Sequence, residues 1–490
     1  MRLSNATLDR LRPEVAAPGY SRASIGTGIV HLGIGAFHRA HQAVYTDAIL
    51  GKDPSWGIAG ISLRSPDTRD ALAPQDGLYT VSALDGAGAG RRVIGASTAL
   101  LVAPEDPAAV LRLLATPATR IVTLTVTEKG YHHDPATGAL REDDAGIEHD
   151  LRRRDAPRTA LGFLVAGLKA RREAGLAPFS ILSCDNLPAN GETVRGLVRA
   201  FANKLDADLG AYIGGEVQFP SSMVDRIVPA TTDQDRQTVG AALGLEDAWP
   251  IMTEPFSQWV VEDRFSLGRP AWDEAGVQFV SDVKPYELMK LRLLNAAHST
   301  LSYLGYLMGH ETVAAAMAEP ALARLVRDLM YLEAGPTLPS LPGFDLDTYR
   351  EDLLTRFKNP ALKHRTWQIA MDGSQKLPQR LLGIARDRLA KGLPIPRIAL
   401  GVAAWMRYVT GLDESGGPID VRDPLAAKLK DISATAGLNA ARLAPALLGL
   451  KEIFGTDLAA DPRFRGPVEQ ALDDLIRIGS LRTVAAAGRQ

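Results

Sequence analysis

Short runs of apolar and β-branched residues alternate with longer helical stretches through the first part of this chain. Four of these runs are expected to form strands, at residues 28–32, 57–63, 120–127 and 179–184. Several are apolar at consecutive positions, as is typical of strands buried on both faces. The alternation therefore predicts a parallel β-sheet covered by helices, a doubly wound α/β arrangement.

From about residue 283 the strand signals fade, and amphipathic stretches follow at residues 286–307, 311–333, 345–357, 375–391 and 438–454. Their apolar residues recur at helical spacing. A chain of 490 residues also exceeds the length that one hydrophobic core usually organises. We therefore expect an α/β domain over residues 1–282 and a predominantly α-helical domain over residues 283–490.

The charge balance argues against two classes of partner. The chain has 55 basic and 57 acidic residues and a net charge of -2, which gives no electrostatic basis for binding nucleic acid or an anionic membrane. We also expect no secretory signal, no transmembrane helix and, with one cysteine, no internal disulfide. The sequence predicts a soluble, cytoplasmic protein.

A glycine-rich turn follows the first predicted strand in the segment IVHLGIGAFHRAHQ. Gly33 and Gly35 lie between that strand and a predicted helix, where the backbone can approach the pyrophosphate of a dinucleotide. His38 replaces the third glycine of the usual G-x-G-x-x-G motif, so helix and strand are expected to pack less closely here. A tight structural turn without a ligand is the alternative interpretation.

The segment after the second strand, GIAGISLRSPD, carries residues that would distinguish NAD from NADP. An acidic residue there accepts hydrogen bonds from the ribose hydroxyls of NAD, whereas a basic residue accommodates the 2′-phosphate of NADP. Asp67 favours NAD and Arg64 favours NADP. We expect NAD, with NADP as an open alternative, and both side chains could instead be exposed loop charges.

Two pairs of histidines superficially suggest a metal. His38 and His41, and the adjacent His132 and His133, have neither an HExxH motif nor clustered Cys/His spacing around them. We expect structural or surface roles for these histidines and no bound metal.

Four polar residues share one side of the helix predicted in KPYELMKLRLLNAAHSTLSYLG. At 100° per residue, an arc of about 140° contains all of them: Glu287, Lys290, Asn295 and His298. Leucines share the arc, so we expect burial to lower the pKa of Lys290. A neutral lysine can accept the hydroxyl proton of an alcohol as hydride leaves, and an asparagine amide can stabilise the alkoxide.

Spacing alone is also compatible with ordinary helix residues, a solvated Lys and Glu beside a buried His and Asn. Asn186 strengthens the catalytic interpretation, because SCDNLPANG places it just after a strand, at the edge where open α/β sheets bind ligands. Its alternative role is to form the turn. Cys184, within the predicted strand, is interpreted as a packing residue.

Six segments, in the same order, resemble the polyol-specific long-chain dehydrogenases, the family of mannitol 2-dehydrogenase and fructuronate reductase. They are GIGAFHRAHQAVYTD, LTVTEKGY, SCDNLPANG, VDRIVPAT, EPFSQWVVEDRF and the K-x4-N-x2-H pattern of Lys290, Asn295 and His298. The resemblance covers nearly the whole chain. It implies a monomeric, zinc-independent enzyme with a Rossmann-like NAD-binding domain and a helical catalytic domain, acting on a small polyol or sugar acid.

The resemblance also implies roles for single residues. Lys290 is the implied general base, and Asn186 and Asn295 are the implied oxyanion pair. His298 would contact the substrate. Glu287 and Asp225 would belong to the network that carries the proton away, although Asp225 could instead pair with the neighbouring Arg226.

The residues expected to contact the cofactor lie in the glycine turn and in two later loops. They are Gly33, Gly35, Ala36, Phe37, Arg64, Asp67, Thr127 and Glu128.

Residues 359–380, NPALKHRTWQIAMDGSQKLPQR, resemble fructuronate reductase more than mannitol 2-dehydrogenase, as does Lys129 of TEKGY. A hexuronate has a carboxylate that a polyol lacks, and bases of this segment could pair with it. The candidates are Lys376, Arg380, His364 and Arg365. A cationic helix face is the alternative, as is contact of Lys376 with neutral hydroxyls. The segment LRSPDTRD, in turn, is closer to the mannitol enzymes.

We therefore expect reversible reduction of fructuronate to mannonate with NADH. Interconversion of mannitol and fructose, or of arabinitol and xylulose, is the alternative. A nucleotide-binding protein that kept the fold and lost the chemistry is a hypothesis of a different class, which NADH turnover with a ketose would exclude.

Overall fold

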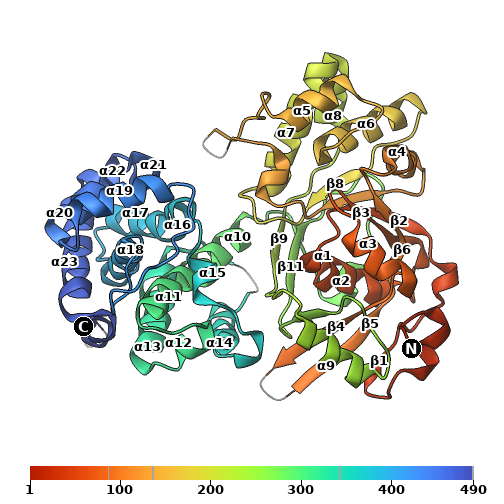
Figure 1. Cartoon of the computed structure of the whole chain (residues 1–490). Helices are drawn as coiled ribbons and strands as arrows, with labels where there is room; N and C mark the ends of the chain where they lie inside the picture. Colours follow the sequence, from red (N-terminus) through yellow and green to blue (C-terminus); the bar gives the residue numbers. More distant parts are fainter. Residues whose placement is uncertain (86–87, 135–136, 342–343, 488–490) are drawn as a thin grey trace. The chain divides into compact units, whose positions relative to one another are not determined.

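The computed structural model describes residues 1–85, 88–134, 137–341 and 344–487. By their internal contacts the residues form two compact units, Met1–Lys284 and Pro285–Gln490. In the described residues, strands β1 to β12 all lie in the first unit, and the second unit is built from helices (Figure 1). The predicted fold class, an α/β part followed by a predominantly helical part, is confirmed.

A five-stranded parallel sheet forms the centre of the first unit, in the order β6-β3-β2-β7-β8. Its strands are β6 (Ser97–Val102), β3 (Gly57–Ser62), β2 (Thr27–Leu32), β7 (Ile121–Leu124) and β8 (Ser180–Ser183). Four of them overlap the predicted runs, although β7 ends three residues before the predicted end at residue 127, and the edge strand β6 was missed. Every residue of β3, β7 and β8 is buried, as expected for strands covered on both faces.

Helices cover one face of this sheet. They are α4 (Pro107–Ala115), α5 (Ala145–Arg152), α6 (Ala160–Glu173), α7 (Asn190–Leu205) and α8 (Ala207–Glu216). The hydrophobic core on this face includes Val30 and Val122 from the sheet and Phe163 from α6. Because neighbouring strand residues point to opposite faces, Ile29 and Ile121 belong to the core on the other side.

Two short helices and two smaller sheets cover the other face. The helices are α1 (Ala36–Ala40) and α2 (Gln42–Ile49). One sheet has the order β1-β5-β4-β10, with β1 (Val15–Ala16), β5 (Gly88–Ile94), β4 (Tyr79–Asp85) and β10 (Ile251–Thr253). The other has the order β12-β11-β9, with β12 (Gln278–Val280), β11 (Gln258–Glu262) and β9 (Ser222–Asp225). The sequence did not predict either sheet.

The helices of the second unit are more interrupted than the sequence predicted. The stretch expected at 286–307 consists of α10 (Lys284–Lys290), a π-helical turn η7 (Leu291–Asn295) and α11 (Ala296–Leu307). The stretch at 311–333 divides into α12 (Val313–Met317), α13 (Pro320–Asp328) and a π-helical turn η8 (Leu329–Ala334). Pro320 starts α13 because proline fits the first turn of a helix and not its interior.

The stretch predicted at 345–357 corresponds to α14 (Leu346–Phe357). The stretch at 375–391 consists of α16 (Gly373–Leu377), a third π-helical turn η11 (Pro378–Leu382) and α17 (Gly383–Ala390). The stretch at 438–454 divides into α20 (Ala440–Leu448) and α21 (Lys451–Phe454). The long helices α18 (Pro396–Tyr408) and α23 (Pro462–Ile478) were missed. They pack together, and α18 also packs against α11 to form the centre of the unit. None of the described helices combines the length and apolar character that crossing a bilayer requires.

His38 of α1 packs directly on His31 of β2 at the third position of the glycine motif. The two imidazole rings stack with centroids 3.4 Å apart. The ring nitrogens of His31 hydrogen bond to Thr123 at 2.7 Å and to Thr125 at 2.9 Å, so the strand histidine is fixed from β7. The imidazole of His38 thus fills the space between α1 and β2 that a glycine at this position would leave empty. Burial lowers the pKa of His31 to about 3.

This burial predicts a loss of stability in acid. In the unfolded chain His31 titrates near 6.5, so below that pH the unfolded state binds a proton that the folded state does not. The contribution of His31 is complete above about pH 6.5 and declines as the pH falls toward about 3. Between pH 6 and pH 4, the free energy of unfolding of the wild type should fall more steeply than that of His31→Asn, by up to about 1.4 kcal/mol per pH unit. Urea unfolding at several pH values measures both slopes, and equal slopes would contradict the assignment.

Candidate active site

The glycine turn lies at the carboxyl end of β2, and its two glycines have different functions. Gly33 has a φ of +95°, and a Cβ atom there would lie 2.2 Å from the carbonyl oxygen of Thr125, so only glycine fits. Gly35 has an ordinary extended backbone, and a Cβ atom there would meet nothing closer than the Gly33 oxygen at 3.8 Å. Gly33 therefore shapes the turn, while Gly35, whose N–H donates to the Gly33 carbonyl, is exposed and leaves room for a ligand where a side chain would stand. This arrangement fits a dinucleotide pyrophosphate.

The other predicted cofactor residues lie around the same edge of the sheet. Ala36 and Phe37 begin α1 and are half-buried. Arg64 and Asp67 follow β3, and Thr127 and Glu128 follow β7; all four are exposed. Because β3, β2 and β7 are neighbouring parallel strands, these loops meet at the carboxyl edge, where open α/β sheets bind their ligands.

Asn186 and Asp225 come from two further strands of the first unit. Asn186 is exposed and lies three residues beyond β8. Asp225 ends β9 and is 4% exposed. Its neighbour Arg226 donates hydrogen bonds to the backbone carbonyls of Ala40 and Glu254, so the guanidinium ties α1 to the segment after β10.

In the second unit, Lys290 and His298 are buried, with 9% and 6% of their surfaces exposed, whereas Glu287 and Asn295 are half-buried. The prediction of an unbroken α-helix through these residues was wrong. The π-helical turn η7 separates Lys290 from His298, and its Ala296 N–H donates to the carbonyl of Leu291, five residues back. Because a π turn is wider than an α turn, the 100° spacing does not hold across it.

His298 is enclosed by aromatic and basic side chains. Its ring lies 4.4 Å from that of Phe357 and 5.5 Å from that of His364. Burial lowers the pKa of His298 well below 6.5, and the neighbouring basic groups of His364, Arg380, Arg356 and Lys290 lower it further. The imidazole is therefore neutral near pH 7, and its buried Nε2 atom has no hydrogen-bond partner among the described residues.

The bases predicted to bind a carboxylate are partly engaged within the protein. Lys376 Nζ donates to the carbonyls of Ile369, at 3.1 Å, and Met371. Arg380 Nη1 donates to the carbonyl of Asn295 at 3.3 Å and to Ser299 Oγ at 3.1 Å. Burial, with Lys376 nearby, lowers the pKa of His364 to about 4. Arg365 is exposed.

Two residues of the candidate site were not predicted from the sequence, one beside His298 and one at the carboxyl edge of the central sheet. Arg356 is 7% exposed and acts on His298. It follows Tyr349 and Leu353 at helical spacing, so a charge on the apolar stripe of α14 was the available signal. Asp185, the residue before Asn186, accepts hydrogen bonds from the loop after β7. A contact between two distant loops leaves no local signal in the sequence.

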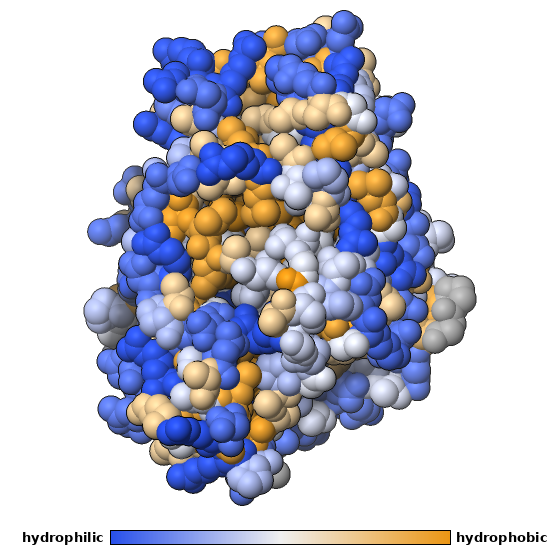
Figure 2. All heavy atoms as spheres, turned by 90° about the vertical axis from the view of Figure 1, so that its right-hand side faces the viewer, coloured by the Kyte–Doolittle hydropathy of each residue, from blue (hydrophilic) through white to orange (hydrophobic). Residues whose placement is uncertain are grey.

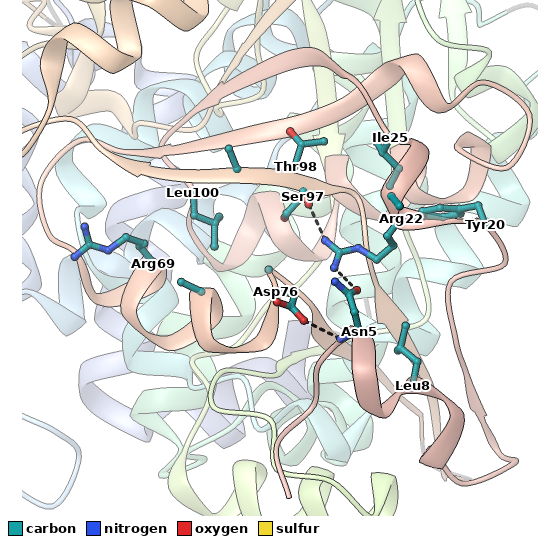
Figure 3. Close-up of a pocket in the computed structure, with 14 residues that line it drawn as sticks. Asn5, Leu8, Tyr20, Arg22, Ile25, Arg69, Asp76, Ser97, Thr98 and Leu100 are labelled. Carbon is teal, nitrogen blue, oxygen red and sulfur yellow. Dashed lines mark hydrogen bonds between the residues drawn. The ribbon is translucent and has the colours of Figure 1, made fainter.

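A separate hollow of about 670 Å³ lies on the first unit, beside the edge strand β6 (Figure 3). It is lined by Ser97 and Thr98 at the amino end of β6, and so lies away from the carboxyl edge that carries the glycine turn. Arg22 in this hollow donates to Asn5 Oδ1 at 2.7 Å and to the carbonyl of Ser97 at 2.8 Å.

On the face of the molecule shown in Figure 2, hydrophobic areas lie among hydrophilic ones.

Two of the four histidines considered for a metal site have polar partners, and a third, His38, stacks on His31. His41 Nε2 lies 2.9 Å from the carbonyl oxygen of Gln258, and His132 pairs with Asp144 at 2.9 Å. In the part of the chain that the structure describes, no group of three or more His, Cys, Asp or Glu side chains is placed to hold a metal ion.

Comparison with known proteins gives matches over almost the whole chain. The mannitol dehydrogenase Rossmann domain matches residues 27–274, and the mannitol dehydrogenase C-terminal domain matches residues 282–476. Uncharacterized oxidoreductase YeiQ of Escherichia coli (strain K12) is 48% identical, covering 95% of this chain and 96% of that protein. D-mannonate oxidoreductase of the same organism is 46% identical, covering 96% and 98%.

A solved structure gives a similar result. Pseudomonas fluorescens mannitol 2-dehydrogenase, in a ternary complex with NAD and D-mannitol, is 40% identical, with a TM-score of 0.89 and coverage of 99% of both chains. Fold and comparisons together define a dehydrogenase with a Rossmann domain. The chain belongs to the mannitol dehydrogenase family, so the predicted family is confirmed.

The two glycines of the turn give a matched test of the cofactor site. Gly33→Ala should lower the free energy of unfolding by at least about 1–3 kcal/mol, because alanine is strained at this φ and its Cβ meets backbone. Gly35→Ala should unfold within about 0.5 kcal/mol of the wild type. Its Cβ atom should nevertheless raise the Kd for NADH about tenfold or more, because it occupies the open side of the turn. Urea unfolding and NADH fluorescence titration measure both effects, and unchanged NADH affinity in Gly35→Ala would remove the turn from the cofactor site.

Proposed function

We propose that this dehydrogenase interconverts fructuronate and mannonate, with NAD(H) as its cofactor. The positive surroundings of His298 carry the proposal, since Arg380, Arg356 and Lys290 all act on its buried imidazole. Clustered cations favour a substrate with a carboxylate, which a hexuronate has and a polyol lacks. The 46% identity with D-mannonate oxidoreductase supports the same substrate.

The residues around the glycine turn fit a bound dinucleotide. Gly35 is open, and the exposed Asp67 can accept hydrogen bonds from ribose hydroxyls. The exposed Arg64 on the same loop keeps NADP as the alternative. The mannitol 2-dehydrogenase of similar structure was solved with NAD. Held by these residues, the nicotinamide would supply the hydride acceptor for the alcohol and, in its reduced form, the hydride donor for the ketone.

Lys290 is the proposed general acid and base. In the reducing direction its ammonium donates a proton to the former keto oxygen, and in the oxidising direction its neutral amine accepts the hydroxyl proton. The side chain is only 9% exposed, so bulk water has little access to the transferred proton. Glu287 and the buried Asp225 are proposed to exchange that proton with solvent.

Amide and imidazole groups are proposed to orient the substrate. The side-chain amides of Asn186 and Asn295 donate to the oxygen on which negative charge develops. His298 Nε2 hydrogen bonds to a substrate hydroxyl. Because burial keeps this imidazole neutral, the ring contributes a hydrogen bond without adding a charge.

Mannitol and fructose form the second candidate pair. Lys376 and Arg380 already donate to backbone carbonyls, which leaves fewer of their N–H groups for a substrate carboxylate. This engagement favours a neutral polyol, and the mannitol 2-dehydrogenase solved with D-mannitol is 40% identical.

A substrate panel distinguishes the two candidates. With NADH, kcat/KM for fructuronate should exceed that for fructose and xylulose at least about tenfold, because a charge-assisted contact to a carboxylate contributes about 1.5–3 kcal/mol. Loss of NADH absorbance measures each rate, and NADPH run in parallel measures cofactor preference. Equal or higher efficiency with fructose would contradict the uronate assignment.

Replacement of Lys290 tests the mechanism. Lys290→Ala should lower kcat about 10²–10⁴-fold, the usual contribution of a general acid or base, while the Kd for NADH stays within about twofold. Lys284→Ala is the matched control, because Lys284 begins the same helix α10 and its side chain is 63% exposed. Near-normal turnover in Lys290→Ala, or an equal loss in both variants, would rule out the proposed role.

A further inference from the structure

The carboxylate of Asp185 connects two loops at the carboxyl edge of the central sheet. Its Oδ2 atom accepts a hydrogen bond from the Val126 N–H at 2.9 Å, and its Oδ1 atom accepts one from the Thr127 N–H at 3.1 Å. Both amides belong to the loop after β7. Asp185 itself follows β8, directly before Asn186. One side chain thus fixes the loop of one strand to the loop of its neighbour.

The backbone that Asp185 holds is strained. Thr127 has a φ of +66°, in the left-handed region that β-branched residues rarely adopt. Such a conformation persists only when surrounding contacts hold it. The bond from Thr127 N–H to Asp185 is one such contact, and it is charge-assisted when the carboxylate is ionised.

Asp185 has two further contacts that anchor it. The Tyr131 hydroxyl donates to Oδ2 at 2.7 Å and lies 2.8 Å from Ser183 Oγ of β8. The Asp185 carbonyl accepts from Asn190 Nδ2 of α7 at 3.1 Å. Burial raises the pKa of Asp185, and the hydrogen bonds from Tyr131 and the two amides act in the opposite direction. The carboxylate thus accepts three hydrogen bonds from the segment after β7, from Val126, Thr127 and Tyr131, while the backbone carbonyl of Asp185 is held by α7.

We infer that Asp185 is a positioning residue, whose carboxylate holds Thr127 and Glu128 in place for the cofactor and fixes Asn186 for the substrate oxygen. The inference rests on the proposed function, in which those residues contact cofactor and substrate. Asp185 itself does not touch the reacting atoms. Its loss displaces the groups that do, and displacements of about 1 Å can lower rates about 10²-fold.

Asp185→Asn tests this role because it keeps the shape of the side chain. An amide has one oxygen, so it can accept from one of the two backbone N–H groups but presents an NH2 group to the other. The variant should raise the Kd for NADH about threefold or more and lower kcat about 10–100-fold. Tyr131→Phe is the matched control, since it removes a hydroxyl from the same carboxylate and leaves both backbone bonds. It should stay within about threefold of the wild type in both quantities. An equal loss in Tyr131→Phe would overturn the inference, because general disruption of the buried polar cluster would then explain the effect.

A second substitution tests whether the bond from Asp185 holds the strained backbone of Thr127. Glycine adopts a φ of +66° without strain, so Asp185→Asn should lower the unfolding temperature less when it is combined with Thr127→Gly than in the wild-type background. Equal losses in the two backgrounds would contradict the inference. If Asp185→Asn does not fold, Thr127→Gly alone still tests it. Relief of the strain should raise the unfolding temperature of this single variant, and a lower one would overturn the inference.

The same experiment separates this inference from the proposed function. If the wild type turns over no ketose or keto-uronate, the proposed function fails, while NADH affinity in Asp185→Asn and Tyr131→Phe still reports on Asp185. If the wild type is active and Asp185→Asn is equally active, only the inference about Asp185 fails.

Discussion

Hydrogen bonds between β3, β2, β7 and β8 run in parallel register, and the loops that follow these strands therefore meet at one edge of the sheet. Gly33, Asp67, Thr127 and Asn186 are far apart in the chain, and this pairing places them in neighbouring loops. These strands are mostly apolar, and buried polar side chains within them are paired, as His31 is with Thr123, so exposed polar side chains concentrate where the strands end. The same burial that stabilises the sheet thus locates the candidate cofactor site.

In the second unit, the burial of basic side chains constrains the structure around the candidate catalytic residues. Lys290 and Arg356 each have less than a tenth of their surface exposed, and burying cationic groups is costly unless hydrogen bonds compensate. The π-helical turn between Lys290 and His298 packs against the turns η8 and η11, and Arg380 of η11 donates to the Asn295 carbonyl and Ser299. Interrupted helices of this kind are frequent at functional sites, because the wider turn redirects side chains.

The sequence predicted local features well and long-range ones poorly. The apolar runs of β2, β3, β7 and β8 and the glycine turn were visible because each depends on neighbouring residues. The sheet that contains β1 was missed, since β1 has two residues and its partner β5 is more than seventy residues away. The turn η7 was missed because its composition does not differ from that of an α-helix. Asp185 was missed for the same reason as β1, because its partners are two backbone amides of another loop. The proposed roles of the site residues remain predictions.

A crystal structure of the enzyme with NADH and mannonate would test the central claim most directly. The account predicts that Lys290 Nζ lies within about 3.2 Å of the substrate hydroxyl that is oxidised, with amide nitrogens of Asn186 and Asn295 on the same oxygen and the pyrophosphate against Gly35. A substrate hydroxyl bound without Lys290, or a cofactor bound away from the glycine turn, would contradict it.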